Sequence, residues 1–285
     1  VFEPKNFVFN RPWGVPVRYH DIKSILRQVK PDFIEYHLSY KDLEMEPHDF
    51  LDNLPDIDFI IHSPELFSGD HILDLATHDM VYRERSLEEL QRVVNVTRKL
   101  SSIHQKTETP KIVANVGGFS MERPLNKDDR MPLYELIMKS LSGLDLHGVE
   151  IIPQTMPPFP WHFGGQRHHN LFVEADEIKW FCESFKARVC LDISHSKLAC
   201  NHAGQSFEEF IDTVGPYVAH IHLADASGVD GEGLQIGDGE IDFSSLSKHL
   251  SRVAPCAGFI PEIWQGHKNN GQGFWQALTL LERWY

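Results

Sequence analysis

The chain has 285 residues, of which 41% are hydrophobic, and its formal net charge is −14 with histidine neutral. This composition is typical of a globular protein with a substantial core, and no apolar run approaches the roughly 18 residues of a membrane span. A nucleic-acid partner is disfavoured, because binding phosphates requires a basic face that displaces counterions. Four cysteines without a C-x-x-C pair, and no signal-peptide pattern, favour a reduced, cytoplasmic setting.

Residues 1–12 form a polar lead-in without periodicity, and the first residue is Val rather than Met. We therefore expect processing, or a domain cut from a longer protein. No internal repeat, linker or low-complexity tract divides the remaining sequence, which predicts one domain over residues 1–285.

Apolar segments that predict strands alternate with segments of helical periodicity. The first predicted helix is capped by Asp21, and the longest begins at Ser86 with a Ser-x-x-Glu capping box. The predicted strands are 14–19, 33–38, 57–62, 111–116, 148–154, 189–193, 218–223 and 258–263. The predicted helices are 22–29, 49–54, 86–104, 133–141, 177–186, 207–214, 246–253 and 274–284.

Eight near-continuous apolar strands indicate a parallel sheet that is covered on both faces. This number favours a closed barrel over an open doubly wound sheet. No Gly-x-Gly-x-x-Gly follows the first predicted strand, so we expect no nucleotide cofactor. The predicted fold is a single-domain α/β protein, a (β/α)8 TIM barrel.

The carboxyl ends of the predicted strands, where such barrels place their active sites, carry many metal-capable residues. These are His37, His62, Asn115, Gln154, Asp192, His195, His222, Asp225 and Glu262. Imidazole and carboxylate together suit zinc, manganese, iron or cobalt better than calcium. The alternative is that Asp192 caps the following turn and the histidines are satisfied core residues. The size of the set favours a metal site.

Several of these residues belong to longer motifs. His62-Ser-Pro follows the third predicted strand, LDISH ends at His195, and HIHLAD covers residues 220–225. GLQIGDGEIDF at residues 233–243 and PEIW around Glu262 follow. In this order the motifs resemble the xylose isomerase-like barrels, the superfamily of sugar-phosphate isomerases/epimerases and AP endonucleases.

The resemblance implies one divalent ion (zinc, manganese or cobalt), held in the epimerases by a Glu, an Asp, a His and a Glu on strands five to eight. Asp192, His222 and Glu262 match this pattern, and Gln154 departs from its first Glu. Gln can coordinate through its carbonyl oxygen but cannot shuttle a proton. A one-base isomerisation or elimination is therefore favoured over two-carboxylate epimerisation, with Glu262 and His195 as the catalytic candidates.

The expected partner is a small carbohydrate or sugar-acid substrate, and a homo-oligomer stays open. Aromatic rings stack on sugar faces, and Arg or His can hold a phosphate or carboxylate. The alternative for Trp161, in its Pro-rich loop, is a rigid packed segment. Arg18 is expected to pair either with an anion or with Glu35. The candidate substrate-binding residues are His37, His62, Asn115, Trp161, His162, Arg167, Asp225 and Trp264.

The leading hypothesis is a divalent-metal-dependent sugar or sugar-phosphate isomerase/epimerase, or a related lyase acting next to a carbonyl. An AP endonuclease-like zinc phosphodiesterase is the second; His62, His195 and Asp230 match that branch, but Asn115 and Glu232 stand where it uses histidines. The third is a non-catalytic ligand-binding domain of a larger sugar-biosynthetic protein, in which Gln154 marks a decayed site.

Overall fold

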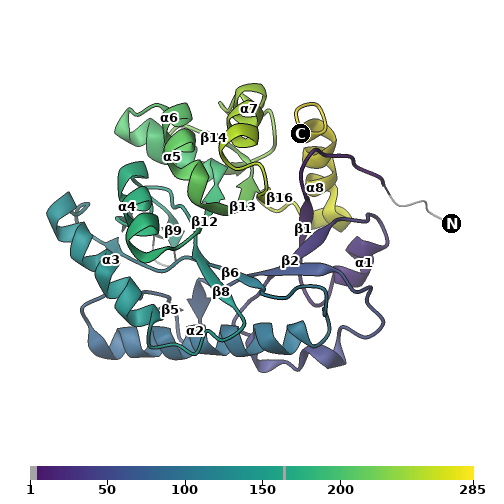
Figure 1. Cartoon of the computed structure of the whole chain (residues 1–285), viewed down its shortest axis with the longest axis horizontal. Helices are drawn as coiled ribbons and strands as arrows, with labels where there is room; N and C mark the ends of the chain where they lie inside the picture. The colour runs from purple at the N-terminus through teal and green to yellow at the C-terminus, as the bar shows by residue number, and fades with distance from the viewer. Residues whose placement is uncertain (1–4, 163–164) are drawn as a thin grey trace.

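The computed structural model describes residues 5–162 and 165–285, apart from the side chains of residues 161–165. Its centre is a barrel of parallel strands, which lies in the middle of the helices in Figure 1. The barrel strands are β1 (Gly14–Val17), β2 (Phe33–His37), β3 (Asp58–His62), β6 (Lys111–Ala114), β8 (Glu150–Pro153), β12 (Val189–Asp192), β13 (Val218–Leu223) and β16 (Gly258–Pro261). Each lies within the strand that the apolar pattern predicts.

The barrel is closed by two narrow seams between two hydrogen-bonded sheets. One sheet has the order β1-β2-β3-β6-β8, and the other has the order β12-β13-β16. The parallel bridge Gln154↔Cys190 joins β8 to β12, and the parallel bridge Trp13↔Phe259 joins β16 to β1. The prediction of a single-domain TIM barrel is confirmed.

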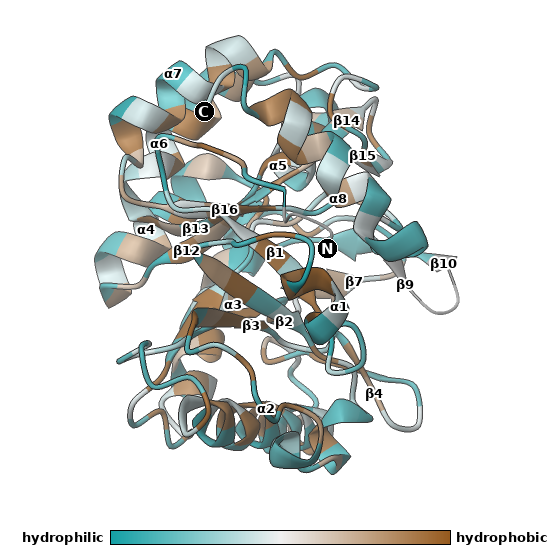
Figure 2. Cartoon of the chain, turned by 90° about the vertical axis from the view of Figure 1, so that its right-hand side faces the viewer, coloured by the Kyte–Doolittle hydropathy of each residue, from teal (hydrophilic) through white to brown (hydrophobic). Residues whose placement is uncertain are grey.

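Helices surround the strands, and Figure 2 shows the brown, apolar strands lying between them. The long helix α2 lies along one side of the molecule, whereas α5, α6 and α7 gather on another (Figure 1). The α-helices are α1 (Ile22–Leu26), α2 (Met80–Ser101), α3 (Lys127–Leu141), α4 (Ala175–Phe185), α5 (Ile193–Ala203), α6 (Phe207–Val214), α7 (Phe243–Val253) and α8 (Lys268–Leu281).

The start of α2 differs from the prediction that Ser86 caps this helix. The helix begins six residues earlier, at Met80, because the Asp79 carboxylate accepts hydrogen bonds from the amides of Val81 and Tyr82. Met80 and Val81 are exposed, so the first turn lacks the apolar periodicity that marks a helix in a sequence. Ser86 is instead buried inside α2, where its hydroxyl accepts from the amide of Asp74.

Two connections also differ from a regular β/α alternation. Between β2 and β3 the described chain has only the 3₁₀ turns η1 (Asp42–Glu44) and η2 (Pro47–Asp49), where the sequence predicts a helix over 49–54. Pro47 and the apolar Leu51 anchor this loop without a helical stripe. After β12, α5 follows directly although no helix is predicted there, because Asp192 ends the strand and caps the helix.

One layer of side chains inside the barrel is apolar, and it lies below a polar layer. Because side chains in a strand alternate, the residue two positions further along faces the interior again, one layer nearer the carboxyl end. The apolar layer contains Phe33, Ile60, Val113, Ile152, Cys190 and Ile260. Two positions further along stand Glu35, His62, Asn115, Gln154, Asp192 and Glu262. The alternation of side chains along the strands thus places a polar layer directly above a packed apolar layer.

The loops at the carboxyl ends of the barrel strands contain short antiparallel strand pairs. β14 (Asp225–Ser227) pairs with β15 (Gly231–Leu234), and β4 (Leu66–Phe67) pairs with β5 (His71–Ile72). β9 (Trp161–His162) pairs with β10 (Gly165–Gln166), and β11 (His168–His169) pairs with β7 (Phe119–Ser120). Among the described residues, the helices are all too short or too polar to cross a membrane.

Candidate metal centre and cavity

A cavity of about 530 Å³ lies at the carboxyl ends of the barrel strands. This volume is in the range of pockets that hold small molecules. Seven residues predicted from the strand ends and loops line it: His37, His62, Gln154, Asp192, His195, Glu262 and Trp264. The structure therefore brings together residues that are up to 227 positions apart in the chain, from His37 to Trp264.

Asp192, His222 and Glu262 form a cluster in which Asp192 and Glu262 line this cavity and His222 is buried beside them. One ligand atom from each of the three lies within 4.8 Å of the others. Nδ1 of His222 lies 2.6 Å from Oε2 of Glu262 and 3.8 Å from Oδ2 of Asp192. Two carboxylates and one imidazole around a common point are a donor set that fits zinc or manganese.

Asp192 serves the cluster and the fold at once. Its Oδ1 accepts a hydrogen bond from the amide of His195 at 2.8 Å, which caps α5. Its other oxygen, Oδ2, faces Gln154 and His222. The capping interpretation and the metal interpretation of Asp192 are therefore compatible, because each uses a different oxygen.

Gln154 lies in the cluster, but the nitrogen of its side-chain amide, not the carbonyl oxygen, faces Asp192 and His222. Its Nε2 donates to Oδ2 of Asp192 at 3.0 Å and lies 3.3 Å from Nδ1 of His222. Its Oε1 lies 3.2 Å from Nε2 of His62. Coordination through Oε1, as predicted from the sequence, would require the amide to turn by half a rotation.

Below the cluster, Glu35 is fully buried among three histidines. Its carboxylate lies 3.1 Å from Nε2 of His222, 2.5 Å from Nε2 of His220 and 3.0 Å from Nε2 of His37. Burial raises the pKa of Glu35, but His222 and His220 outweigh it and hold that pKa well below its usual range. Glu35 is not among the site residues predicted from the sequence.

The carboxylates around His222 favour the charged form of its imidazole. Burial lowers its pKa, but the carboxylates of Glu262 and Glu35 outweigh burial and raise that pKa well above its usual value. Conversely, burial raises the pKa of Glu262, but His222 outweighs it and holds that pKa below its usual range. A cation held at Nδ1 of His222 would be attracted by the same carboxylates.

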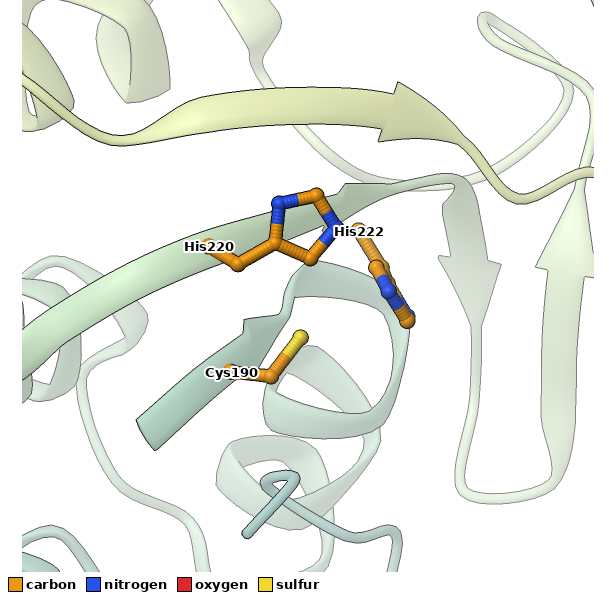
Figure 3. A group of neighbouring side chains, drawn as sticks. All are labelled: Cys190, His220 and His222. Atoms are coloured by element: carbon orange, nitrogen blue, oxygen red, sulfur yellow. The ribbon is translucent and has the colours of Figure 1, made fainter. Parts of the chain in front are cut away.

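Cys190 approaches the histidines of β13 from the neighbouring strand. Figure 3 shows its sulfur directed toward the rings of His220 and His222. These three residues are buried, and their ligand atoms also lie within 4.8 Å of one another. Burial raises the pKa of the Cys190 thiol to about 12, so the free protein keeps it protonated and packed against the rings.

His195 and Glu232 lie next to each other in the lining of the cavity. Nε2 of His195 lies 3.5 Å from Oε2 of Glu232, and its Nδ1 lies 3.0 Å from the carbonyl oxygen of Thr155. Burial lowers the pKa of His195, but Asp192, Glu232 and Glu262 together raise it above its usual value. Glu232, on the β14–β15 hairpin, is a further cavity residue that the sequence analysis did not include among the site residues.

Three predicted substrate-binding residues, Asn115, Arg167 and Asp225, are not among the described residues that line this cavity, and their binding role stays a prediction. Asn115 is buried, and its Oδ1 accepts from the amide of Gly117 and lies 3.1 Å from Nε2 of His169. The guanidinium carbon of Arg167 lies 5.9 Å from the ring centre of Phe119. Both residues brace loops.

Asp225 is the third of these residues, and its carboxylate holds a loop in place. It is fully buried and accepts hydrogen bonds from the amides of Ala226, Gly237, Gly239 and Ile241 at 2.9 to 3.1 Å. Four amide donors thus engage both oxygens of this carboxylate. Position at a strand end did not distinguish this structural role from a binding role.

The two aromatic predictions have different outcomes. The backbone of Trp161 and His162 forms β9, but their side chains lie outside the described residues, so their binding role stays a prediction. Trp264 lines the cavity with 74% of its surface exposed, and its amide donates to the carbonyl oxygen of Gly233 at 2.8 Å. An exposed indole at the mouth of a polar pocket can stack against a sugar.

Comparison with known proteins places this chain in a family. The model of the xylose isomerase-like TIM barrel family matches residues 26–284, so the chain belongs to that family. An uncharacterized protein of Methanocaldococcus jannaschii is 29% identical over 107 residues, which is 38% of this chain. The match spans about a third of that relative, 34% of its length.

Two solved structures illustrate the range of the fold. A D-allulose 3-epimerase from Methylomonas sp., in complex with D-allulose, superposes with a TM-score of 0.63 at 13% identity, covering 99% of this chain and 100% of its own. Endonuclease IV from Thermus thermophilus superposes with a TM-score of 0.56 at 17% identity, covering 96% of this chain and 98% of its own. At these identities the likeness concerns the fold alone.

Proposed function

We propose that this protein is a divalent-metal-dependent enzyme that acts on a sugar or sugar derivative next to a carbonyl group. The reaction would be an isomerisation, an epimerisation or a related elimination. One observation carries the proposal: Asp192, His222 and Glu262 present their ligand atoms within 4.8 Å of one another beside a cavity in this family's barrel. The sugar epimerases among the structural neighbours support the substrate class.

Asp192, His222 and Glu262 would hold one zinc, manganese or cobalt ion, with Gln154 as a fourth ligand once its amide has turned. A bound ion would supply Lewis-acid polarisation of a carbonyl oxygen and its neighbouring hydroxyl. Glu35 would keep a proton on Nε2 of His222, and thereby direct the Nδ1 lone pair into the cluster.

His195 and Glu262 are the proposed proton carriers. Nε2 of His195 lies beside Glu232 at the cavity wall, where the raised pKa of His195 keeps a proton available for a substrate oxygen or carbon. Glu262, at 28% side-chain exposure, is open to the cavity. Gln154 cannot carry a proton, which supports a one-base reaction over an exchange between two opposing carboxylates.

The test is the metal content of the full chain, purified without chelator or added metal. We expect one equivalent of a divalent ion, and its loss in Asp192→Asn, since Asn keeps the helix cap but removes the charge. Asp242→Asn is the matched control, because Asp242 caps α7 through the amides of Ser244 and Ser245, away from the cavity. This control should keep its ion.

The other outcomes separate the alternatives. Close to three zinc ions per chain, together with incision of abasic DNA, would overturn the proposal in favour of a phosphodiesterase. No ion, even after reconstitution with zinc, manganese and cobalt, would overturn it in favour of a non-catalytic ligand-binding domain.

A further inference from the structure

One wall of the cavity is basic in a protein whose net charge is −14. Arg18 follows β1, and His267 and Lys268 lie between β16 and the first turn of α8. The three side chains line the cavity that also contains Asp192 and Glu262. Because β16 and β1 are neighbours through the Trp13↔Phe259 bridge, the three residues come from adjacent positions on the barrel rim.

Among the described residues, no side chain forms an ion pair or hydrogen bond with the guanidinium of Arg18. Within the described chain no carboxylate lies in ion-pair distance of it, and the hydrogen bond of Arg18 to Asp21 uses the backbone amide. The sequence offered Glu35 as a partner, but the Glu35 carboxylate is surrounded by histidines instead. A half-buried guanidinium that lines a cavity without a counterion favours an anionic ligand.

His267 and Lys268 stand close to this guanidinium. Burial lowers the pKa of His267, and the positive charge of Arg18 is the next cause, which places the two groups near each other. Nζ of Lys268 donates to Oε1 of Gln265 at 2.9 Å and keeps its remaining protons. Asp21 is the acidic neighbour of this wall, and it is occupied in part by the amide of Arg18 and by His20 at 3.9 Å.

The strand order places Gln154 across the barrel from Arg18, whereas Asp192 is three strands from β1 and two strands from β16. In the order of the sheets, β8 is four strands from β1, and β12 follows β8 across the seam. In a closed eight-stranded barrel a separation of four strands is the far side. A ligand that reaches from Arg18 to Gln154 therefore crosses the cavity, whereas Glu262 follows β16 on the same side as His267 and Lys268.

We propose that Arg18, His267 and Lys268 form an oxyanion subsite, which takes the phosphate or carboxylate of a sugar derivative while its hydroxyl-bearing carbons reach the metal cluster. This assignment rests on the proposed function for the reacting end, and it narrows the substrate to anionic sugars. Arg would supply two parallel N–H donors, and Lys would supply a point charge. A neutral sugar would leave both cations unpaired.

The test measures binding of inorganic phosphate and of acetate to the chelator-treated full chain, by calorimetry and by Trp fluorescence. We expect phosphate to bind at millimolar concentration or tighter, and Arg18→Gln to weaken it about tenfold or more. Lys268→Gln should weaken it severalfold. Lys30→Gln removes an exposed charge beyond α1, outside the cavity lining, and should leave the affinity unchanged.

The two anions distinguish the ligand source. Tighter binding of phosphate supports a sugar phosphate, and tighter binding of acetate supports a sugar acid. The subsite is overturned if neither anion binds, or if Arg18→Gln, with an unchanged melting temperature, binds as well as the parent. Because this experiment contains no metal, its result is independent of the metal content that tests the proposed function.

Discussion

The Glu35 carboxylate and the Glu262 carboxylate contact opposite nitrogens of one imidazole: Oε1 of Glu35 lies 3.1 Å from Nε2 of His222, and Oε2 of Glu262 lies 2.6 Å from Nδ1. A carboxylate behind a metal-binding histidine sets its tautomer and strengthens it as a ligand. Glu35 can do this from inside the barrel, where it is fully buried, without touching a ligand in the cavity.

We therefore predict that Glu35→Gln lowers the affinity for Co²⁺ by about 10- to 100-fold, measured from the visible absorption of the bound ion. Glu150→Gln is the control, because Glu150 lies on β8 at the other end of the barrel and pairs with Arg188. Unchanged Co²⁺ affinity in Glu35→Gln would show that the contact with Nε2 does not tune the ligand.

Glu262→Gln should abolish turnover and leave the fold intact. Loss of a proton carrier typically costs about 10²- to 10⁴-fold in rate, and here the side chain is also a proposed metal ligand. A screen of sugar phosphates and sugar acids gives the rate, and far-ultraviolet circular dichroism checks the fold. Glu209→Gln, at an exposed carboxylate on α6, controls for the loss of one charge. Retained activity in Glu262→Gln would refute its assignment.

Asp225→Ala should destabilise the protein far more than it affects anion or metal binding per folded molecule. The substitution leaves four amide donors near Ala226 and in the 237–241 loop without their acceptor. Each buried unsatisfied donor costs roughly 1–3 kcal/mol, so we expect a loss of several kcal/mol in the free energy of unfolding. Urea unfolding measures it, and a loss below about 1 kcal/mol would contradict the structural role.

His104 gives the protein a stability that depends on pH and is separate from the cavity. It is fully buried, its Nε2 lies 2.7 Å from Oη of Tyr36, and burial lowers its pKa to about 4. Between this value and about 6.5, the unfolded chain binds the proton more readily than the folded one. The free energy of unfolding therefore falls as the pH falls from about 6.5 to about 4.

His104→Gln should flatten this dependence, since Gln still offers an acceptor to Tyr36 and does not titrate. The difference between pH 7 and pH 4 in the free energy of unfolding should shrink by up to roughly 3 kcal/mol. His48→Gln, at an exposed histidine that contacts Ser102, should leave the slope unchanged. Equal slopes for His104→Gln and the parent would contradict the assignment.

The strands and their carboxyl-end residues could be predicted because apolar runs and alternation depend on local sequence. His62, Asp192 and Glu262 follow apolar residues by two positions, and that spacing alone places them one layer above the packed apolar layer. Which polar residue faces the cavity depends on loops that return from elsewhere. Asn115 contacts His169, and Asp225 accepts hydrogen bonds from the 237–241 loop. The spacing of residues in the sequence does not predict either contact.

Glu35 was missed for a related reason. A carboxylate in an apolar strand indicates a buried partner, and the alternation Glu35-Tyr36-His37 shows that Glu35 and His37 share a face. This alternation predicts which face Glu35 occupies but not which strand it contacts, because His220 and His222 are 185 and 187 residues away. The helix start at Asp79 was missed because the apolar residues of the first turn, Met80 and Val81, face solvent. They therefore do not continue the apolar stripe that marks the rest of α2 in the sequence.

The seam between β8 and β12 has a consequence for how the cluster holds together. Asp192, His222 and Glu262 all belong to the three-stranded sheet, or to the residue that directly follows it, whereas Gln154 follows the five-stranded sheet. The Thr155 amide donates to the carbonyl oxygen of Cys190 across that seam at 2.9 Å. An ion held by the first three residues would leave the seam free to open, and an ion that also recruits Gln154 would lock it. Slower hydrogen exchange of the Thr155 amide when metal is bound would therefore indicate that Gln154 is a ligand. This measurement does not require a known substrate.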